Sequence, residues 1–199
     1  MRIKLLLFTL IFFAAERHGY SQNSDLGLLA GVSAPRGEVV SSGSTYVHGS
    51  VGASGQIDYA WQILQRAADL YVELPFVISW RGSGTVTSSM INSSNGLDYF
   101  FTPGLRLKIS PQSRVSFYAA AGGGLASFGT SQATVAQGVT VVSSRTTTAA
   151  LGFGGGLDFR LTRLLSLRVE GRDFLTRPGL DSTAGRNHAI FQAGIAFHF

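Results

Sequence analysis

The sequence contains no cysteine, few prolines and little charge. Without cysteine, the chain cannot carry a disulfide scaffold, a thiolate metal site or a lipoprotein anchor, although the redox compartment stays open. Only 14% of the residues are charged while 45% are hydrophobic, and the basic residues behind the net charge of +5 are scattered along the chain. Because no basic run or basic helical pattern occurs, the sequence argues against nucleic acid as a partner.

Long hydrophobic runs are missing as well. The one apolar run, residues 5–15, follows a short basic start and is too short to cross a bilayer as a helix. This arrangement predicts a signal peptide over residues 1–21 and one exported domain over residues 22–199. Cleavage after Ser21 and cleavage after Ala15 both stay open. A permanent N-terminal anchor is the weaker interpretation, because the apolar run ends in charged residues.

What the chain does contain is a regular alternation of large apolar residues with small or charged ones. The alternation is clearest over residues 149–174, where each half repeats with a period of two. A period of two is that of a β-strand with one apolar face, so this stretch predicts a hairpin with its turn near Thr162 and Arg163. The apolar side carries Leu151, Phe153, Leu157, Phe159, Leu161, Leu165, Leu167 and Val169.

The same alternation predicts eight strands along the chain. Pro75 and Pro103 fall inside two of them and predict a bulge or a gap in the ladder, because proline lacks a backbone donor. The connections alternate between long Ser/Thr/Gly-rich loops and short turns. The predicted strands cover residues 26–33, 45–62, 70–81, 97–109, 114–125, 151–161, 165–174 and 188–199.

Alternating long and short connections are typical of an up-and-down barrel in an outer membrane, with short turns on one rim. Strands of about ten residues match a tilted crossing of the hydrocarbon layer, and backbone groups in lipid must all be paired, which requires a closed sheet. The sequence therefore predicts an all-β fold, an eight-stranded antiparallel up-and-down transmembrane β-barrel.

Alternation alone does not say which face is outside, since a soluble lipocalin-type barrel would turn its apolar face inward. Charges of both signs share one face with glycine and alanine, as the narrow interior of an eight-stranded barrel requires. Aromatic residues lie near strand ends on the other face, where interfacial girdles belong. The predicted lumen charge network is Glu73, Arg106, Lys108, Asp158, Arg160, Arg168, Glu170 and Arg172. The predicted aromatic girdle is Tyr59, Trp61, Trp80, Tyr99 and Phe159, with Phe199.

The pattern GFGGGLDFRLTRLLSLRVEGR over residues 152–172 resembles the penultimate hairpin of the small outer-membrane β-barrels, the OmpA-type transmembrane domain and the OmpX-like proteins. The end of the chain, with Phe197 and Phe199, resembles the terminal signal read by the outer-membrane barrel assembly machinery. The resemblance implies the outer membrane of a Gram-negative-type bacterium. It implies outer-membrane lipid, lipopolysaccharide, the assembly machinery and periplasmic chaperones as partners of a monomer.

The resemblance does not decide the activity, because such barrels include anchors, adhesins, pores and enzymes. We expect a structural or surface-interaction role with a plugged lumen, since eight strands leave little more than side-chain space. Glu170 is expected to compensate Arg168 and Arg172, so Glu170→Ala should lower the unfolding midpoint, and an unchanged midpoint would contradict such a network. A narrow porin-like pore is the first alternative.

A lipid A-modifying enzyme is the second alternative. His48 and Ser50 have the H-x-S spacing of lipid A deacylases, but no glutamate is obviously placed beside them, so the chain is expected not to be an enzyme. His188 and His198 lie about a strand's length apart and cannot share a metal. The glycine run at residues 152–156 lacks the following helix that a nucleotide site needs. No cofactor is expected.

Overall fold

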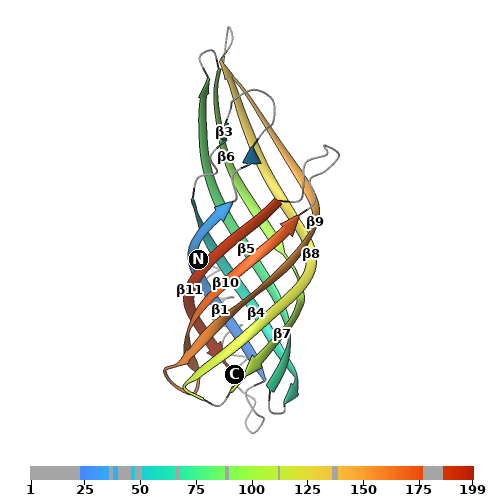
Figure 1. Ribbon diagram of the computed structural model, residues 1–199, viewed down its shortest axis with the longest axis vertical. Coiled ribbons are helices and arrows are strands. Elements are labelled where there is room, and N and C mark those ends of the chain that lie inside the picture. Colours follow the sequence, from blue (N-terminus) through green and yellow to red (C-terminus); the bar gives the residue numbers. More distant parts are fainter. Residues whose placement is uncertain are drawn as a thin grey trace, which may run out of the picture.

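The computed structural model describes residues 23–35, 38–39, 46–47, 51–65, 68–87, 90–111, 113–135, 139–176 and 186–199. The predicted signal peptide and the His48 and Ser50 pair lie outside these described residues. Figure 1 shows long tilted strands wound around one axis. Within the described ranges, no helix is both long and apolar enough to span a membrane.

The strands form one sheet that closes on itself. Antiparallel pairing runs in the order β4-β1-β11-β10-β9-β8-β6-β5-β7, and further pairings of β4 with β5 and of β8 with β7 complete the ring. The short strands β2 (Glu38–Val39) and β3 (Tyr46–Val47) pair separately. The wall consists of β1 (Ser24–Pro35), β4 (Gly52–Gln65), β5 (Ala68–Thr87), β6 (Met90–Phe101), β7 (Gly104–Ile109), β8 (Val115–Val135), β9 (Val139–Arg160), β10 (Leu165–Thr176) and β11 (Arg186–His198).

Strands β6 and β7 together form one wall strand, interrupted at Thr102 and Pro103. Both halves pair with β5 and with β8, and the register is the same on either side of the interruption. In that register Pro75 of β5 lies opposite the same gap, so the two prolines share one interruption. The predicted gap is confirmed, and counting β6 and β7 as one strand confirms the closed eight-stranded antiparallel barrel. A register shift occurs elsewhere, between β4 and β5 near Gln62.

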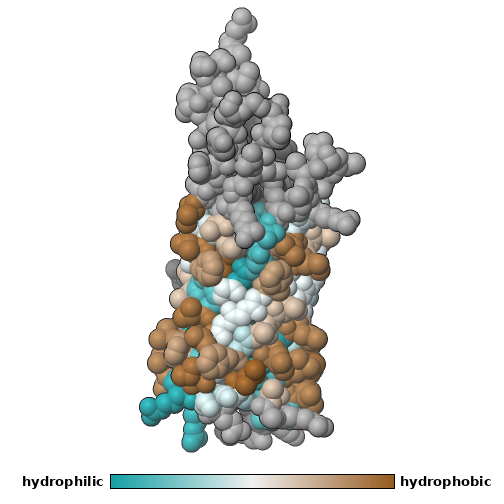
Figure 2. All heavy atoms as spheres, in the orientation of Figure 1, coloured by the Kyte–Doolittle hydropathy of each residue, from teal (hydrophilic) through white to brown (hydrophobic). Residues whose placement is uncertain are grey.

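The apolar face is on the outside. Along β4 and β10, buried and exposed residues alternate as the period of two requires. Leu151 is 61% exposed and Phe191 59%, whereas the charged Arg168 between the exposed Leu167 and Val169 is fully buried. A soluble barrel has the opposite arrangement. In Figure 2, apolar side chains cover much of the described wall in this view, with polar side chains at the lower rim.

Two hairpins are much longer than the sequence indicates. The alternation predicts one polar loop over residues 82–96 and another over residues 129–145, in which residues 139–142 offer an extension of the hairpin. In the structure β5 and β6 stay paired to Thr87 and Met90, and β8 and β9 to Val135 and Val139. Backbone pairing continues above the level where the apolar alternation stops, because ladder hydrogen bonds do not depend on an apolar face. In Figure 1, these ribbons rise above the rest of the wall at the top of the view.

The opposite rim has tight turns. Residues 110–114 join β7 to β8, with Ser110 at a positive φ of 55°, and residues 161–164 join β9 to β10. The beginning of β1 and the end of the chain meet at this rim, where Ser24 and Phe199 exchange two backbone hydrogen bonds of 2.9 Å. We call this the turn rim and the other the hairpin rim.

Candidate functional site

The interior of the barrel holds the only dense gathering of charged side chains that the described residues show. Each strand contributes through its inward-facing alternate positions. The gathering lies nearer the turn rim, and it is built around three arginines from two strands, Arg106 of β7 and Arg168 and Arg172 of β10.

Arg168 binds three carboxylates. Its Nε lies 2.6 Å from Asp158 Oδ1, the residue directly opposite it on β9. Its Nη1 lies 3.1 Å from Asp58 Oδ2 of β4, and its Nη2 lies 3.3 Å from Asp25 Oδ2 of β1. Since β4 and β1 are not neighbours of β10, this guanidinium reaches across the lumen.

Arg106 extends the same network on the other side of Asp58. It bonds Asp58 and places its Nε 2.8 Å from Glu73 Oε2. The ring of Tyr118 lies 4.8 Å from the Arg106 guanidinium carbon and 5.1 Å from that of Arg168, so the aromatic face stabilises both cations.

Lys108 supplies a further cation at the same level. Its Nζ lies 2.7 Å from Asp158 Oδ2 and 3.8 Å from Asp25 Oδ2. Both aspartates therefore contact a lysine as well as Arg168.

Arg172 connects opposite sides of the barrel. It pairs with Glu170 on its own strand, and its Nη1 lies 2.9 Å from Glu73 Oε1. Glu73 is on β5, which lies opposite β10 in the ring. Glu170 also accepts hydrogen bonds from the Tyr118 hydroxyl and from Gln56 Nε2, the latter at 3.1 Å.

The structure brings seven of the eight predicted charges to this interior network, all of them buried: Glu73, Arg106, Lys108, Asp158, Arg168, Glu170 and Arg172. Arg160 differs. As the last residue of β9 it lies at the turn rim, half-buried, and it donates to the carbonyl oxygen of Pro111. The expectation that Glu170 pairs with both Arg168 and Arg172 is wrong for Arg168. Glu170 pairs with Arg172, whereas the ion pairs of Arg168 are with aspartates.

Sequence reasoning missed four members of the network: Asp25, Asp58, Tyr118 and His198. Asp58, Tyr118 and His198 stand in phase with the inward positions of their strands, so the alternation was enough to predict that they point into the barrel. Asp25 precedes the first predicted strand by one residue, and extending that strand would have placed it inward as well.

A second hydrogen-bonded chain crosses the seam between the first and last strands. His198 Nδ1 lies 2.6 Å from Asp25 Oδ1, and His198 Nε2 lies 2.7 Å from Ser166 Oγ. Serine, histidine and aspartate in this order have the connectivity of a hydrolytic triad. Ser166, however, is only 1% exposed, so its hydroxyl is closed to a substrate carbonyl. The chain links β10, β11 and β1 at the turn rim.

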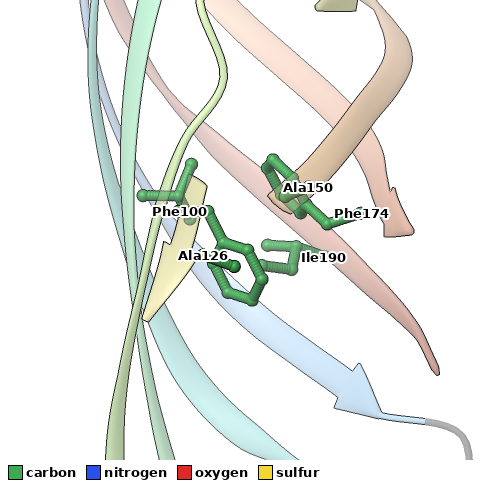
Figure 3. Close-up of a cluster of buried hydrophobic side chains, with 6 residues drawn as sticks. Phe100, Ala126, Ala150, Phe174 and Ile190 are labelled. Atoms are coloured by element: carbon green, nitrogen blue, oxygen red, sulfur yellow. The ribbon is translucent and has the colours of Figure 1, made fainter. Parts of the chain in front are cut away.

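A cluster of buried apolar side chains lies inside the barrel nearer the hairpin rim (Figure 3). Phe100 and Phe174 stack with ring centroids 4.5 Å apart, although their strands are not neighbours. Ile190 and Val77 pack with them and are at most 1% exposed. These residues stand in phase with the polar face of their strands, so the alternation alone does not reveal the apolar cluster.

Glycine makes room for the large interior side chains. A Cβ on Gly27 would collide with Asp58 and crowd Arg168 Nη1, and a Cβ on Gly156 would collide with the Tyr118 hydroxyl. The glycine run of β9 therefore serves packing beside the charge network, as the strand context indicates.

The predicted girdle residues lie on the outer face at two levels. Tyr59, Trp61 and Phe159 are exposed on the turn-rim half of the wall, and the Tyr59 ring lies 6.4 Å from that of Phe199. On the hairpin-rim half, Trp80 is 52% exposed. Tyr99 stacks on Phe76 at 6.0 Å. At the end of the chain, the exposed Phe197 follows the alternation of β11.

The fold is that of small outer-membrane β-barrels. No family model and no curated protein sequence matches the chain. Among solved structures, Neisserial surface protein A aligns with a TM-score of 0.58 at 16% identity, over 92% of this chain and 100% of its own. Ail of Yersinia pestis, solved in complex with the heparin analogue sucrose octasulfate, aligns with a TM-score of 0.53 at 14% identity, over 89% and 99%. The outer membrane protease OmpT of Escherichia coli aligns with a TM-score of 0.51 at 10% identity, over 92% and 99%. At these identities the likeness concerns the fold alone.

Proposed function

We propose that the protein is an integral outer-membrane barrel of a Gram-negative-type bacterium, with a lumen closed by its own side chains and a structural or surface-interaction role. The apolar outer face supports the membrane location. Phe191, Phe197 and Phe199 are exposed on the outside along and just after β11, and this strand is long enough to cross about 25 Å of hydrocarbon when tilted.

The observation that carries the closed lumen is the Arg172–Glu73 ion pair. It joins side chains from opposite sides of the ring, and both residues are at most 4% exposed. Arg168 and Arg106 extend this layer, and the stacked Phe100 and Phe174 form a second layer. A hydrated ion would have to break paired charges and then cross an apolar layer, and each step has a high desolvation cost.

With the lumen closed, the surface role falls to the two long hairpins, β5–β6 and β8–β9. In the first hairpin β5 has 20 residues and the combined strand of β6 and β7 covers residues 90–109. In the second, β8 and β9 have 21 and 22 residues, and all of these are longer than a membrane crossing requires. The excess length stands outside the bilayer, where a ladder-paired hairpin presents residues to the surroundings.

Single-channel recording of the refolded protein in a planar bilayer tests the closed lumen. We expect no discrete openings from a sample that migrates differently before and after boiling on a detergent gel. Discrete openings whose ion selectivity changes in Arg172→Gln would contradict the proposal and favour the narrow pore.

We propose that the protein is not an enzyme and that the Asp25–His198–Ser166 chain has a structural role, holding the seam of the barrel closed. Its support is the burial of Ser166 and the position of the chain across β10, β11 and β1. Modification of Ser166 by a fluorophosphonate probe in the folded barrel would contradict this role.

We also propose that the protein is a monomer, delivered by periplasmic chaperones to the barrel assembly machinery.

A further inference from the structure

Four polar side chains gather on the outer face of the wall near the hairpin rim. They are Tyr99 of β6, Ser127 of β8, and Arg145 and Thr147 of β9. The Arg145 guanidinium carbon lies 4.8 Å from the centre of the Tyr99 ring, and Arg145 Nη1 lies 3.5 Å from Ser127 Oγ. Thr147 Oγ1 lies 3.3 Å from the same hydroxyl. We call these four residues the rim cluster.

Strand register explains how Arg145 reaches two strands away. Tyr99 pairs with Ser127, Ser127 pairs with Thr147, and the residue opposite Arg145 on β8 is Gly129. Gly129 has no side chain, and the guanidinium lies over this position, where a Cβ would be in van der Waals contact with Arg145 Nη2 at 3.6 Å. The arginine is thereby held over the Tyr99 ring.

The rim cluster lies where the apolar wall ends. On the same strands, the next outward residues toward the turn rim are Phe101, Leu125 and Ala149, and Leu151 follows. Leu125 is 57% and Leu151 61% exposed, as lipid-facing side chains are. A polar cluster with an aromatic ring directly above such a surface stands at the level of the lipid headgroups.

The charge of Arg145 is not balanced by the described residues around it. Its contacts there are a tyrosine ring and a hydroxyl, both neutral, whereas the interior arginines each contact carboxylates. An exposed guanidinium presents several parallel donors and binds phosphate oxygens in a bidentate manner. Two hydroxyls beside it add donors, and the apolar wall below suits acyl chains.

We propose that the rim cluster binds the phosphate group of a lipid in the outer leaflet, with Arg145 as the main contact and the acyl chains lying over Phe101, Leu125 and Leu151. This inference rests on the proposed outer-membrane location. The ligand class is a phosphorylated glycolipid or another anionic lipid whose headgroup reaches the Tyr99 level. A free phosphate ion shares the oxyanion but lacks the acyl contacts.

Binding of phosphorylated and dephosphorylated lipid A to the refolded barrel in detergent tests the site, with native mass spectrometry as the readout. We expect the wild type to prefer the phosphorylated form by about tenfold, the scale of one charged hydrogen bond. Arg145→Gln should abolish this preference. Arg163→Gln, which changes another exposed arginine at the turn rim, is the matched control and should retain it.

An Arg145→Gln variant that keeps the wild-type preference would overturn the proposal, as would an equal loss in Arg163→Gln. Inorganic phosphate at equal concentration should not displace the lipid, and displacement would overturn the assignment to a lipid. Folding of each variant is first checked by its change in migration on a detergent gel before and after boiling. Channel openings would contradict the closed lumen without changing the lipid ratio, so the two proposals fail separately.

Discussion

At the scale of single residues, burial distinguishes two kinds of arginine in this barrel. Arg168 and Arg106 are fully buried and each contacts more than one carboxylate, because a buried charge is tolerated only when it is compensated. Arg145 and Arg160 lie near the two rims, and their described contacts are with neutral groups. Removing one arginine of each kind should therefore have very different effects.

Arg168→Met should lower the free energy of unfolding by about 3–5 kcal/mol, since Asp158, Asp58 and Asp25 would lose a shared cation in a buried site. Arg160→Met should change it by less than about 1 kcal/mol, because that side chain has a carbonyl partner at the rim. Urea unfolding in lipid vesicles measures both. Equal losses would show that Arg160 belongs to the network after all.

Glu170→Ala should also lower the unfolding midpoint, but through Arg172, Tyr118 and Gln56, since these are the groups that bond this carboxylate.

At the scale of the elements, the seam between β1 and β11 completes the barrel. It joins the first wall strand to the last, and Ser24 with Phe199 forms its final pair of backbone hydrogen bonds. The side chain of Phe199 lies against Tyr59 of β4. The end of β11 thus closes the ring.

Phe199→Ala should reduce the fraction of the protein that folds in the outer membrane, measured as the heat-shifted band on a detergent gel. Phe191→Ala is the matched control on the same strand, because that side chain is 59% exposed and lies outside the terminal signal. It should fold as the wild type does. If both variants assemble equally well, the terminal aromatic residue is not part of the assembly signal.

At the scale of the whole molecule, the two rims differ in a way that predicts sidedness. Tight turns and the chain end lie at one rim, and the long hairpins lie at the other. In outer-membrane barrels the short turns face the periplasm. The rim cluster should therefore face the cell exterior.

The absence of cysteine makes sidedness simple to measure. Thr147→Cys should react with a membrane-impermeant maleimide on intact cells, because Thr147 is exposed above the apolar wall. Arg163→Cys, in the exposed turn of residues 161–164, should react only after the outer membrane is permeabilised. The reverse pattern would show that the barrel is inserted the other way.

The sequence by itself determined the eight strands across the wall and divided the residues of each strand between two opposite faces. These follow from a local rule, since a period of two places Leu167 and Arg168 on opposite sides whatever their neighbours are. The same rule placed the predicted charges on one common face, and seven of them are buried in the lumen. Pro75 and Pro103 predicted the interruption of the wall.

Only the tertiary structure decided which of these groups meet. Arg172 and Glu73 are distant in the chain and come together because closure of the ring sets β10 opposite β5. The stacking of Phe100 on Phe174 and the reach of Arg145 across Gly129 depend on register between strands in the same way. Alternation determines to which face a side chain points, but closure of the ring and strand register determine which residues it contacts there.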